Sequence, residues 1–236
     1  MKTSRLLPSL WSETSSCRIA WWSWGKTPNW HAYGAVFHGR EQARLTGCKP
    51  YMQEKTDKAA LRRALLANRQ QLPEEVRKLL DARIGAQVLA WWRMQRPQRI
   101  GVYWPMRAEP DLREIYTTLC REGVQLALPV VIEKDVALDF AAWKPGAALV
   151  RDCHGVPVPP TGAARLKPDA LLIPCVGFNA KRQRLGYGGG YYDRTLAGTP
   201  RPETIGVAYD IARCDFEGGE HDIALDRIIT ESGLLP

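Results

Sequence analysis

The feature that most constrains the fold of this chain is a regular alternation of helical and strand-like patterns after residue 52. The longest apolar stripe steps by three or four residues, as one buried helical face does, and consists of Val76, Leu80, Ile84, Val88 and Trp91. Short apolar runs follow it, and residues 170–173, bounded by two prolines, are typical of a buried strand. Such alternation favours an α/β sheet with helices on both faces.

The local signals give approximate bounds for these elements. A helix is expected from Thr56 or Asp57 to about Gln71, because either side chain can cap its first turn. Pro73 suits the first turn of the helix that carries the stripe, and residues 111–121 predict a third helix. Strands are expected at residues 99–104, 125–131, 137–143, 170–173, 204–209 and 227–230, and a proline-rich loop at 151–168. The predicted fold is a single three-layer α/β/α domain over residues 52–236, with a mostly parallel, Rossmann-like sheet.

Composition places this chain of 236 residues among globular proteins. Its hydrophobic content is 45% and its charged content 25%, which is enough to build a core without disulfides. No run of about 18 apolar residues is present, so no membrane span is expected. The six cysteines form no CxxC pair and are interpreted as reduced thiols, which predicts a cytoplasmic location.

Residues 1–51 differ in character from the rest of the chain. They hold five of the nine tryptophans and carry a net charge of +5, against +3 for residues 52–236, and they sustain neither helical nor strand periodicity. One hypothesis is that Met52 is the true start and that residues 1–51 are a non-conforming extension. The alternative is a basic arm for RNA or a membrane surface.

A glycine-rich run at residues 184–194 is the strongest functional signal. Arg184 enters the run, Arg194 leaves it, and Asp193 supplies a hard oxygen of the kind that Mg²⁺ prefers. Bare backbone N–H groups form a nest for an anion at the glycines of this run, which are Gly186, Gly188, Gly189 and Gly190. We interpret it as a nucleotide-phosphate loop before a helical turn at 191–196; a tight structural turn is the alternative for the isolated motif.

This loop, with the strand-like residues before it and Gly177-Phe178, resembles the 5-formyltetrahydrofolate cyclo-ligase family, also called methenyltetrahydrofolate synthetases. The resemblance spans residues 54–236 and depends on further separated pieces. These are Lys58-Ala-Ala-Leu61-Arg62, Tyr103-Trp104-Pro105-Met106 with Glu109, Phe140 with Trp143-Lys-Pro145-Gly146, His221-Asp222, and the run from Asp226 to Thr230. The chain departs from the family pattern at Val158, where many members have glutamate, and at Gly189, where some have lysine; Arg184, Lys181 or Arg182 would then take the role of that lysine.

The resemblance implies an ATP- and Mg²⁺-dependent enzyme that converts 5-formyltetrahydrofolate to 5,10-methenyltetrahydrofolate. It implies Arg184 and Tyr191 as catalytic residues, and Asp193 and Asp226 as metal ligands. The implied ATP-binding residues are Lys58, Arg62, Arg184, Gly186, Tyr187, Gly188, Gly189, Gly190, Tyr191 and Tyr192. The implied folate-binding residues are Glu109, Trp143, Tyr187, Gly188, Gly189, Gly190 and Tyr191. We expect a monomer, with neither a membrane nor a nucleic acid as partner.

Two other classes of function stay open at this point. A sugar-phosphate isomerase or an acyl-CoA transferase on a similar scaffold would need a carboxylate base or nucleophile in the cleft, and no local motif indicates one. A nucleic-acid-binding protein would act through the basic, tryptophan-rich residues 1–51, and its RNA binding would be salt-sensitive and lost when they are deleted.

Overall fold

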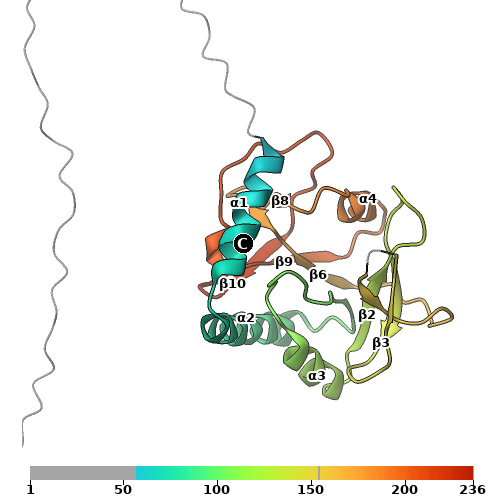
Figure 1. Ribbon diagram of the computed structural model, residues 1–236. Helices are drawn as coiled ribbons and strands as arrows, with labels where there is room; N and C mark the ends of the chain where they lie inside the picture. The colour runs from blue at the N-terminus through green and yellow to red at the C-terminus, as the bar shows by residue number, and fades with distance from the viewer. Residues whose placement is uncertain (1–56, 154, 236) are drawn as a thin grey trace, which may run out of the picture. The chain divides into compact units, whose positions relative to one another are not determined.

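The structure is a computed structural model, and it describes residues 57–153 and 155–235 (Figure 1). The hypotheses on residues 1–51 lie outside the described residues.

Within the described residues, four α-helices form where sequence signals predicted helices. Helix α1 (Lys58–Gln71) begins after Asp57, whose carboxylate accepts a hydrogen bond from the N–H of Ala59. Helix α2 (Glu74–Gln95) follows Pro73 and has two glutamates in its first turn, where the helix dipole favours negative charge. The other helical segments are α3 (Arg113–Arg121), α4 (Tyr191–Leu196) and the 3₁₀ turn η1 (Asp210–Ala212).

The described residues form a seven-stranded sheet in the order β11-β10-β9-β6-β1-β2-β3. Its strands are β1 (Arg99–Gly101), β2 (Gln125–Val130), β3 (Asp139–Trp143), β6 (Ala170–Pro174), β9 (Glu203–Val207), β10 (Arg227–Thr230) and β11 (Gly233–Leu235). The five inner strands are parallel, and β3 and β11 pair antiparallel at the two edges. The prediction of a mostly parallel α/β sheet is therefore confirmed, although β11 was not expected.

Helices cover both faces of the sheet. Ile84 and Val88 of α2 and Leu119 of α3 pack in one core cluster with Ile100, Leu172 and other strand residues. Leu196 of α4 belongs to a second cluster with Leu171 and Ile173. Since neighbouring residues of a strand point to opposite faces, Leu171 and Leu172 fall in different clusters. Ile84, Val88 and Trp91 of the predicted stripe are thus buried in the core and Leu80 packs against it, whereas Val76 is 40% exposed and lies outside the core.

Two small hairpins lie beside the main sheet. Strands β4 (Val150–Arg151) and β5 (Pro157–Val158) pair antiparallel within the segment expected to be a loop. Strands β7 (Gly177–Phe178) and β8 (Arg184–Leu185) pair directly before the glycine run, and this pairing fixes where the run begins. None of the described helices is long and apolar enough to cross a membrane.

Candidate functional site

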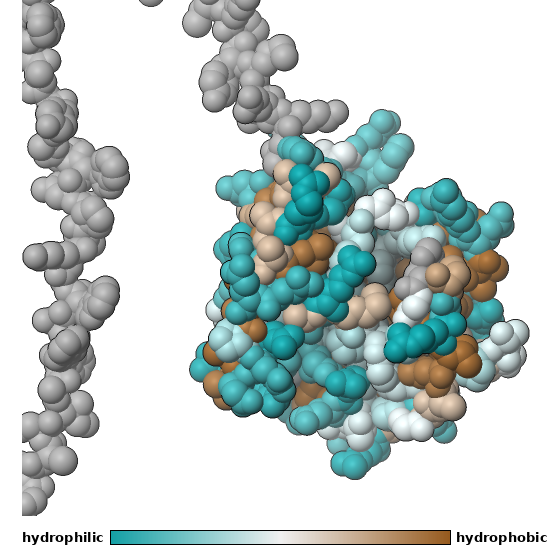
Figure 2. Space-filling view, in the orientation of Figure 1, coloured by the Kyte–Doolittle hydropathy of each residue, from teal (hydrophilic) through white to brown (hydrophobic). Residues whose placement is uncertain are grey.

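A pocket of about 560 Å³ opens where the parallel strands end. Pro174 ends β6, Pro129 lies at the end of β2, Tyr103 follows β1, and all of them line the pocket together with the glycine run. In parallel α/β sheets, ligands bind at this carboxyl edge. In the space-filling view this face is hollowed between α1 and the side of β2 and β3, where hydrophobic residues gather (Figure 2).

The glycine run forms one wall of the pocket. Gly188 and Gly190 have φ angles of 101° and 65°, which favour glycine over residues with a Cβ atom. Among the described residues, the backbone N–H groups of Gly188, Gly189 and Gly190 have no hydrogen-bond partner. Those N–H groups are open to an acceptor from outside the chain, as a nest for an anion requires.

Three cationic side chains converge on this wall. The Nε of Arg62 donates to the carbonyl of Gly186 at 2.7 Å, and Lys58 Nζ contacts Asp222 Oδ2 at 2.6 Å. Arg184 pairs with Asp193 at 3.1 Å, and its side chain is only 8% exposed. All three line the pocket, so the glycine wall is its positively charged half.

A buried carboxylate lies in the adjoining half. Glu109 is 4% exposed, and its two oxygens accept hydrogen bonds from the Tyr187 hydroxyl at 2.6 Å and the Met106 N–H at 2.9 Å. Burial raises the pKa of Glu109, although the hydrogen bond from Tyr187 and the charges of nearby arginines oppose that rise. This half of the pocket therefore holds a fixed acceptor for a ligand that presents hydrogen-bond donors.

Apolar side chains complete the half that contains Glu109. They are Trp104, Met106, Pro129, Val131, Leu138 and Val156. Trp143, which was expected to bind folate, is not among them. It is 6% exposed and packs edge-on against Trp104 and Tyr116 in the core. Its neighbour Trp104 lines the pocket, whereas the side chain of Trp143 lies in the core.

The structure does not bring Asp226 to Asp193. Asp226 precedes β10 at the amino edge of the sheet, where its carboxylate accepts hydrogen bonds from the N–H and hydroxyl of Thr204. It does not line the pocket, and the expected Asp193–Asp226 metal pair is corrected accordingly. The second carboxylate on the positively charged half is Asp222.

The described residues contain no cluster of three or more His, Cys, Asp and Glu side chains that could hold a metal ion. A divalent ion at Asp193 and Asp222 would therefore need oxygen ligands from a bound substrate and from water, as Mg²⁺ commonly has.

Comparison with known proteins matches residues 54–231 to the 5-formyltetrahydrofolate cyclo-ligase family. The chain belongs to this family. Similar relatives are the 5-formyltetrahydrofolate cyclo-ligase of Mycolicibacterium smegmatis, 30% identical over 73% of this chain and 93% of the relative, and that of Mycoplasma pneumoniae, 30% identical over 74% and 99%.

Solved structures of the family have the same fold. The 5,10-methenyltetrahydrofolate synthetase of Mycoplasma pneumoniae aligns with a TM-score of 0.63 at 29% identity, over 74% of this chain and 99% of that chain. The synthetase of Aquifex aeolicus aligns with a TM-score of 0.66 at 26% identity, over 75% and 91%. These likenesses support the sequence-based expectation of a cyclo-ligase scaffold.

The two departures from the family pattern have different structural settings. Val158 is buried in β5, so no charged group lies at that position. At Gly189, a Cβ atom would lie 2.9 Å from the ring of Tyr191, so a side chain there requires that ring to move. Of the three cations expected to replace the lysine of other members, Arg184 alone lines the pocket.

Sequence reasoning missed Arg69, and it named Asp222 only as part of the family-like His221-Asp222 element, without a role at the site. Arg69 is a buried arginine of α1 that hydrogen-bonds to Tyr187 of the glycine run. A signal for it was present, because Lys58, Arg62 and Arg69 are separated by four and seven residues and share one helical face. The pairing of Asp222 with Lys58 had no signal in the sequence, because this salt bridge joins positions 164 residues apart.

Proposed function

We propose that this protein is an ATP- and Mg²⁺-dependent 5-formyltetrahydrofolate cyclo-ligase that forms 5,10-methenyltetrahydrofolate, ADP and phosphate. The observation that carries the proposal is the division of one pocket into two chemically different halves. One half has cations and glycine N–H groups that have no partner among the described residues, and the other has a buried carboxylate between apolar walls. The family's relatives carry the corresponding name.

The positively charged half suits the triphosphate of ATP. Lys58, Arg62 and Arg184 neutralise its charge, and the N–H groups of Gly188 to Gly190 donate hydrogen bonds to its oxygens. Arg184 is held by Asp193 and lies over the ring of Tyr192, with 5.2 Å between the guanidinium carbon and the ring centre. A guanidinium fixed in this way can stabilise charge that develops during phosphoryl transfer without reorganising first.

The half around Glu109 suits the pterin. The amidine-like edge of a pterin presents two N–H donors, and an ionised carboxylate accepts both. Trp104 and Tyr191 supply aromatic faces on the pocket wall, and Met106 and Val131 extend its apolar surface. Because the carboxylate of Glu109 is negatively charged and buried, it also favours a ligand that presents neutral N–H donors over a ligand that presents an anion there.

The chemistry needs a better leaving group than the formyl oxygen. That oxygen belongs to an amide, which resonance stabilises. It attacks the γ-phosphorus of ATP, the bond to the β-phosphate oxygen breaks, and ADP leaves. The neighbouring folate nitrogen then attacks the formyl carbon within the same molecule, and phosphate departs with the former formyl oxygen and takes up the proton that this nitrogen loses. In this scheme Arg184 and Tyr191 flank the transferred group, and no cysteine or serine nucleophile is required.

Asp193 and Asp222 fit a magnesium ion that arrives with ATP. In each carboxylate one oxygen is engaged, by Arg184 in Asp193 and by Lys58 and the Gly219 N–H in Asp222, while the other oxygen has no partner among the described residues. When bound, Mg²⁺ neutralises charge on the phosphates. We expect Asp193→Asn to raise the Mg²⁺ concentration needed for half-maximal turnover about tenfold; an unchanged requirement would contradict the metal role.

The proposal includes the setting in which the enzyme acts. Residues 52–236 form the cyclo-ligase domain, which works as a cytoplasmic monomer on small molecules, without a nucleic acid or a membrane as partner. The alternatives among isomerases and acyl-CoA transferases lose their support with the family match, since that match concerns cyclo-ligases.

One assay tests the proposed function. The purified full chain is mixed with 5-formyltetrahydrofolate, ATP and Mg²⁺, and the absorbance of the methenyl product is followed. Product should form only when all three components are present, and ADP should accumulate in equal amount. Product formed without ATP, or no product at all, would contradict the proposal. A Lys181→Gln variant, which alters an exposed cation outside the pocket, is the control.

A further inference from the structure

A buried arginine that the proposed chemistry does not use connects the two halves of the pocket. Arg69 is 4% exposed and forms no salt bridge with the described carboxylates. Burying a guanidinium is unfavourable unless its donors are satisfied. The partners of Arg69 therefore indicate what the side chain holds in place.

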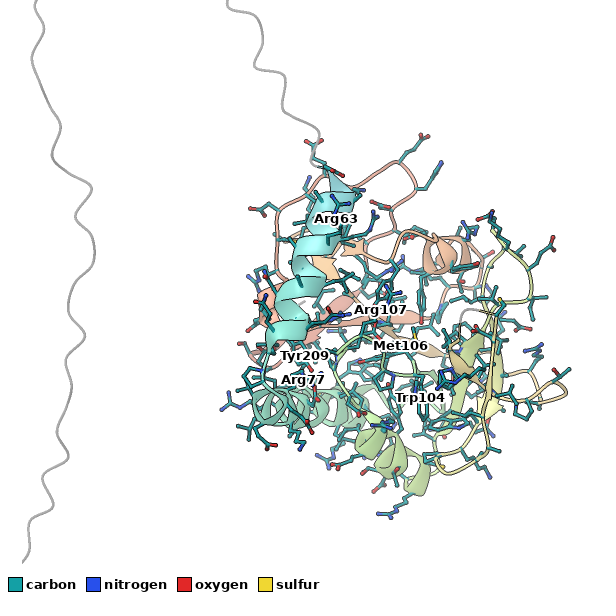
Figure 3. The ribbon with its side chains drawn as sticks, viewed as in Figure 1. Arg63, Arg77, Trp104, Met106, Arg107 and Tyr209 are labelled. Atoms are coloured by element: carbon teal, nitrogen blue, oxygen red, sulfur yellow. The ribbon has the colours of Figure 1, made fainter. Side chains whose placement is uncertain are left out.

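Its donors reach three separate segments. Nε donates to the carbonyl of Arg107 at 3.1 Å, in the turn after β1. Nη1 donates to the carbonyl of Cys175 at 3.3 Å, directly after β6, and Nη2 donates to the hydroxyl of Tyr187 at 2.8 Å, in the glycine run. Figure 3 places Arg107 and Met106 between α1 and the sheet. Arg69 is thus a shared anchor for the glycine wall and the turn that carries Glu109.

Tyr187 continues this chain of hydrogen bonds. Its hydroxyl accepts from Arg69 and donates to Glu109 Oε1 at 2.6 Å. The guanidinium of Arg107 also lies over the Tyr187 ring, 5.2 Å from its centre. A guanidinium and a carboxylate bridged by one hydroxyl polarise it from both sides and strengthen the two bonds. Glu109 is therefore joined to the glycine run by the hydrogen bond from Tyr187.

The turn that presents Glu109 needs such support. Arg107 and Ala108 have φ angles of 47° and 59°, a left-handed conformation that residues with a Cβ atom rarely adopt. Conformations of this kind persist when surrounding contacts hold them. Here the contacts are the Arg69 bond to Arg107 and two bonds between Met106 and Glu109.

We propose that Arg69 is a positioning residue that, through Tyr187, couples folate binding at Glu109 to nucleotide binding at the glycine run; this rests on the proposed function. A folate that fixes Glu109 also fixes Tyr187, so the glycine run has less freedom to lose when it takes up phosphates. The coupling is reciprocal, because each ligand must change the affinity of the other by the same factor.

Binding without turnover measures this coupling. The dissociation constant of ADP with Mg²⁺ is determined by calorimetry on the full chain, with and without saturating 5-formyltetrahydrofolate, and the converse titration checks reciprocity. We expect ADP to bind about fivefold more tightly with the folate present. In Tyr187→Phe, which keeps the ring and removes the hydroxyl, this factor should fall to about one; because the factor is a ratio of two affinities of the same variant, a change in the affinity for ADP alone cancels out of it.

Arg69→Lys tests the anchor itself, since an ammonium group cannot reach three divergent acceptors as a guanidinium does. It should also abolish the coupling, and the double variant should lose nothing further. Arg63→Lys, at an exposed position of the same helix, is the matched control and should keep the wild-type factor.

A wild-type factor of one, or an unchanged factor in Tyr187→Phe, would overturn the proposal, and Tyr187→Phe decides even if Arg69→Lys fails to fold. Absence of binding of either ligand to the wild type would instead overturn the proposed function and this inference with it.

Discussion

At the scale of single residues, Gly186 shows how a missing side chain creates a functional geometry. A Cβ atom on Gly186 would lie 2.1 Å from Arg184 Nη1 and 3.1 Å from its Cζ. The guanidinium therefore occupies the space that any other residue would fill. This glycine serves Arg184 by leaving it room, rather than by adopting a special backbone conformation.

The variant Gly186→Ala should displace Arg184 without unfolding the protein. The displaced atoms are the end of a flexible side chain, so we expect the free energy of unfolding to change by less than about 1 kcal/mol. Because Arg184 would leave its place beside Asp193, kcat/KM should fall about a hundredfold. Steady-state kinetics and thermal unfolding check both expectations. The control is Gly198→Ala, where the nearest atom lies 3.5 Å away; equal kinetics in the two variants would contradict the account.

The buried carboxylate of Glu109 predicts an unusual pH dependence of folate binding. Burial raises the pKa of Glu109 above its ordinary value of 4.5. Since the ionised form accepts the pterin donors, the affinity for 5-formyltetrahydrofolate should fall as pH drops through this raised pKa. The fall should therefore occur at a higher pH than it would for an exposed glutamate. The same shift means that protonated Glu109 favours the folded state, and that this contribution to stability is lost as pH rises through the raised pKa.

Glu109→Gln isolates this effect from titration of the folate. We expect the variant to lose about ten- to hundredfold in folate affinity at neutral pH, the value of a charge-assisted hydrogen bond, and to lose the pH dependence assigned to Glu109. Its affinity for ADP alone should change less than about threefold. Fluorescence titrations from pH 5 to pH 8 would check this, and the same pH profile in both proteins would exclude the carboxylate as its origin.

At the scale of elements, α1 concentrates the contacts of the positively charged half. Lys58, Arg62 and Arg69 lie on one face of this helix, and their partners belong to the segments around Asp222, Gly186 and Tyr187. Since Gly186 and Tyr187 are neighbours in the glycine run, the helix thus fixes that run and the segment around Asp222 relative to one another.

Lys58→Met should reduce nucleotide affinity more than stability. The Lys58–Asp222 pair is partly exposed, with side chains 29% and 27% accessible, so its loss should change the free energy of unfolding by about 1 kcal/mol or less. Removing a cation from the phosphate site and leaving Asp222 unpaired there should weaken ADP binding about tenfold. Calorimetry with urea unfolding would check this, and a variant with full ADP affinity would remove Lys58 from the nucleotide site.

The elements that sequence predicted are those with a repeated pattern or a cap. The stripe from Val76 to Trp91 and the cap at Asp57 locate α1 and α2 closely, and strand β10 begins and ends as predicted. Strands of two residues, such as β5 and β8, are too short to show an alternation, and β11 depends on pairing with β10.

The same distinction holds for the site. Residues within one motif, such as Gly186 and Asp193, could be predicted, because their neighbours in sequence supply the signal. The burial of Trp143 in the core could not be predicted, since the face of β3 on which its side chain lies depends on how β3 pairs with β2. Asp226 likewise lies on one edge of the sheet and Asp222 on the pocket, although they are four residues apart.

At the scale of the whole molecule, the pocket is lined by parts of the chain that are far apart in sequence. Lys58 and Asp222, at its positively charged half, are 164 residues apart. Ligands that bind there bind only the folded state, so they must stabilise the entire domain and not one loop.

We therefore expect ADP with Mg²⁺, at about 100 times its dissociation constant, to add about 2.7 kcal/mol to the free energy of unfolding. For a domain of this size, that corresponds to a rise in Tm of about 5–10 °C. At the same ADP concentration, the tenfold weaker binding of Lys58→Met should remove about 1.4 kcal/mol of this stabilisation. Differential scanning calorimetry measures both values. If ADP left Tm unchanged in the wild type, the glycine wall would not be a nucleotide site; if Lys58→Met kept the full rise, α1 would lie outside it.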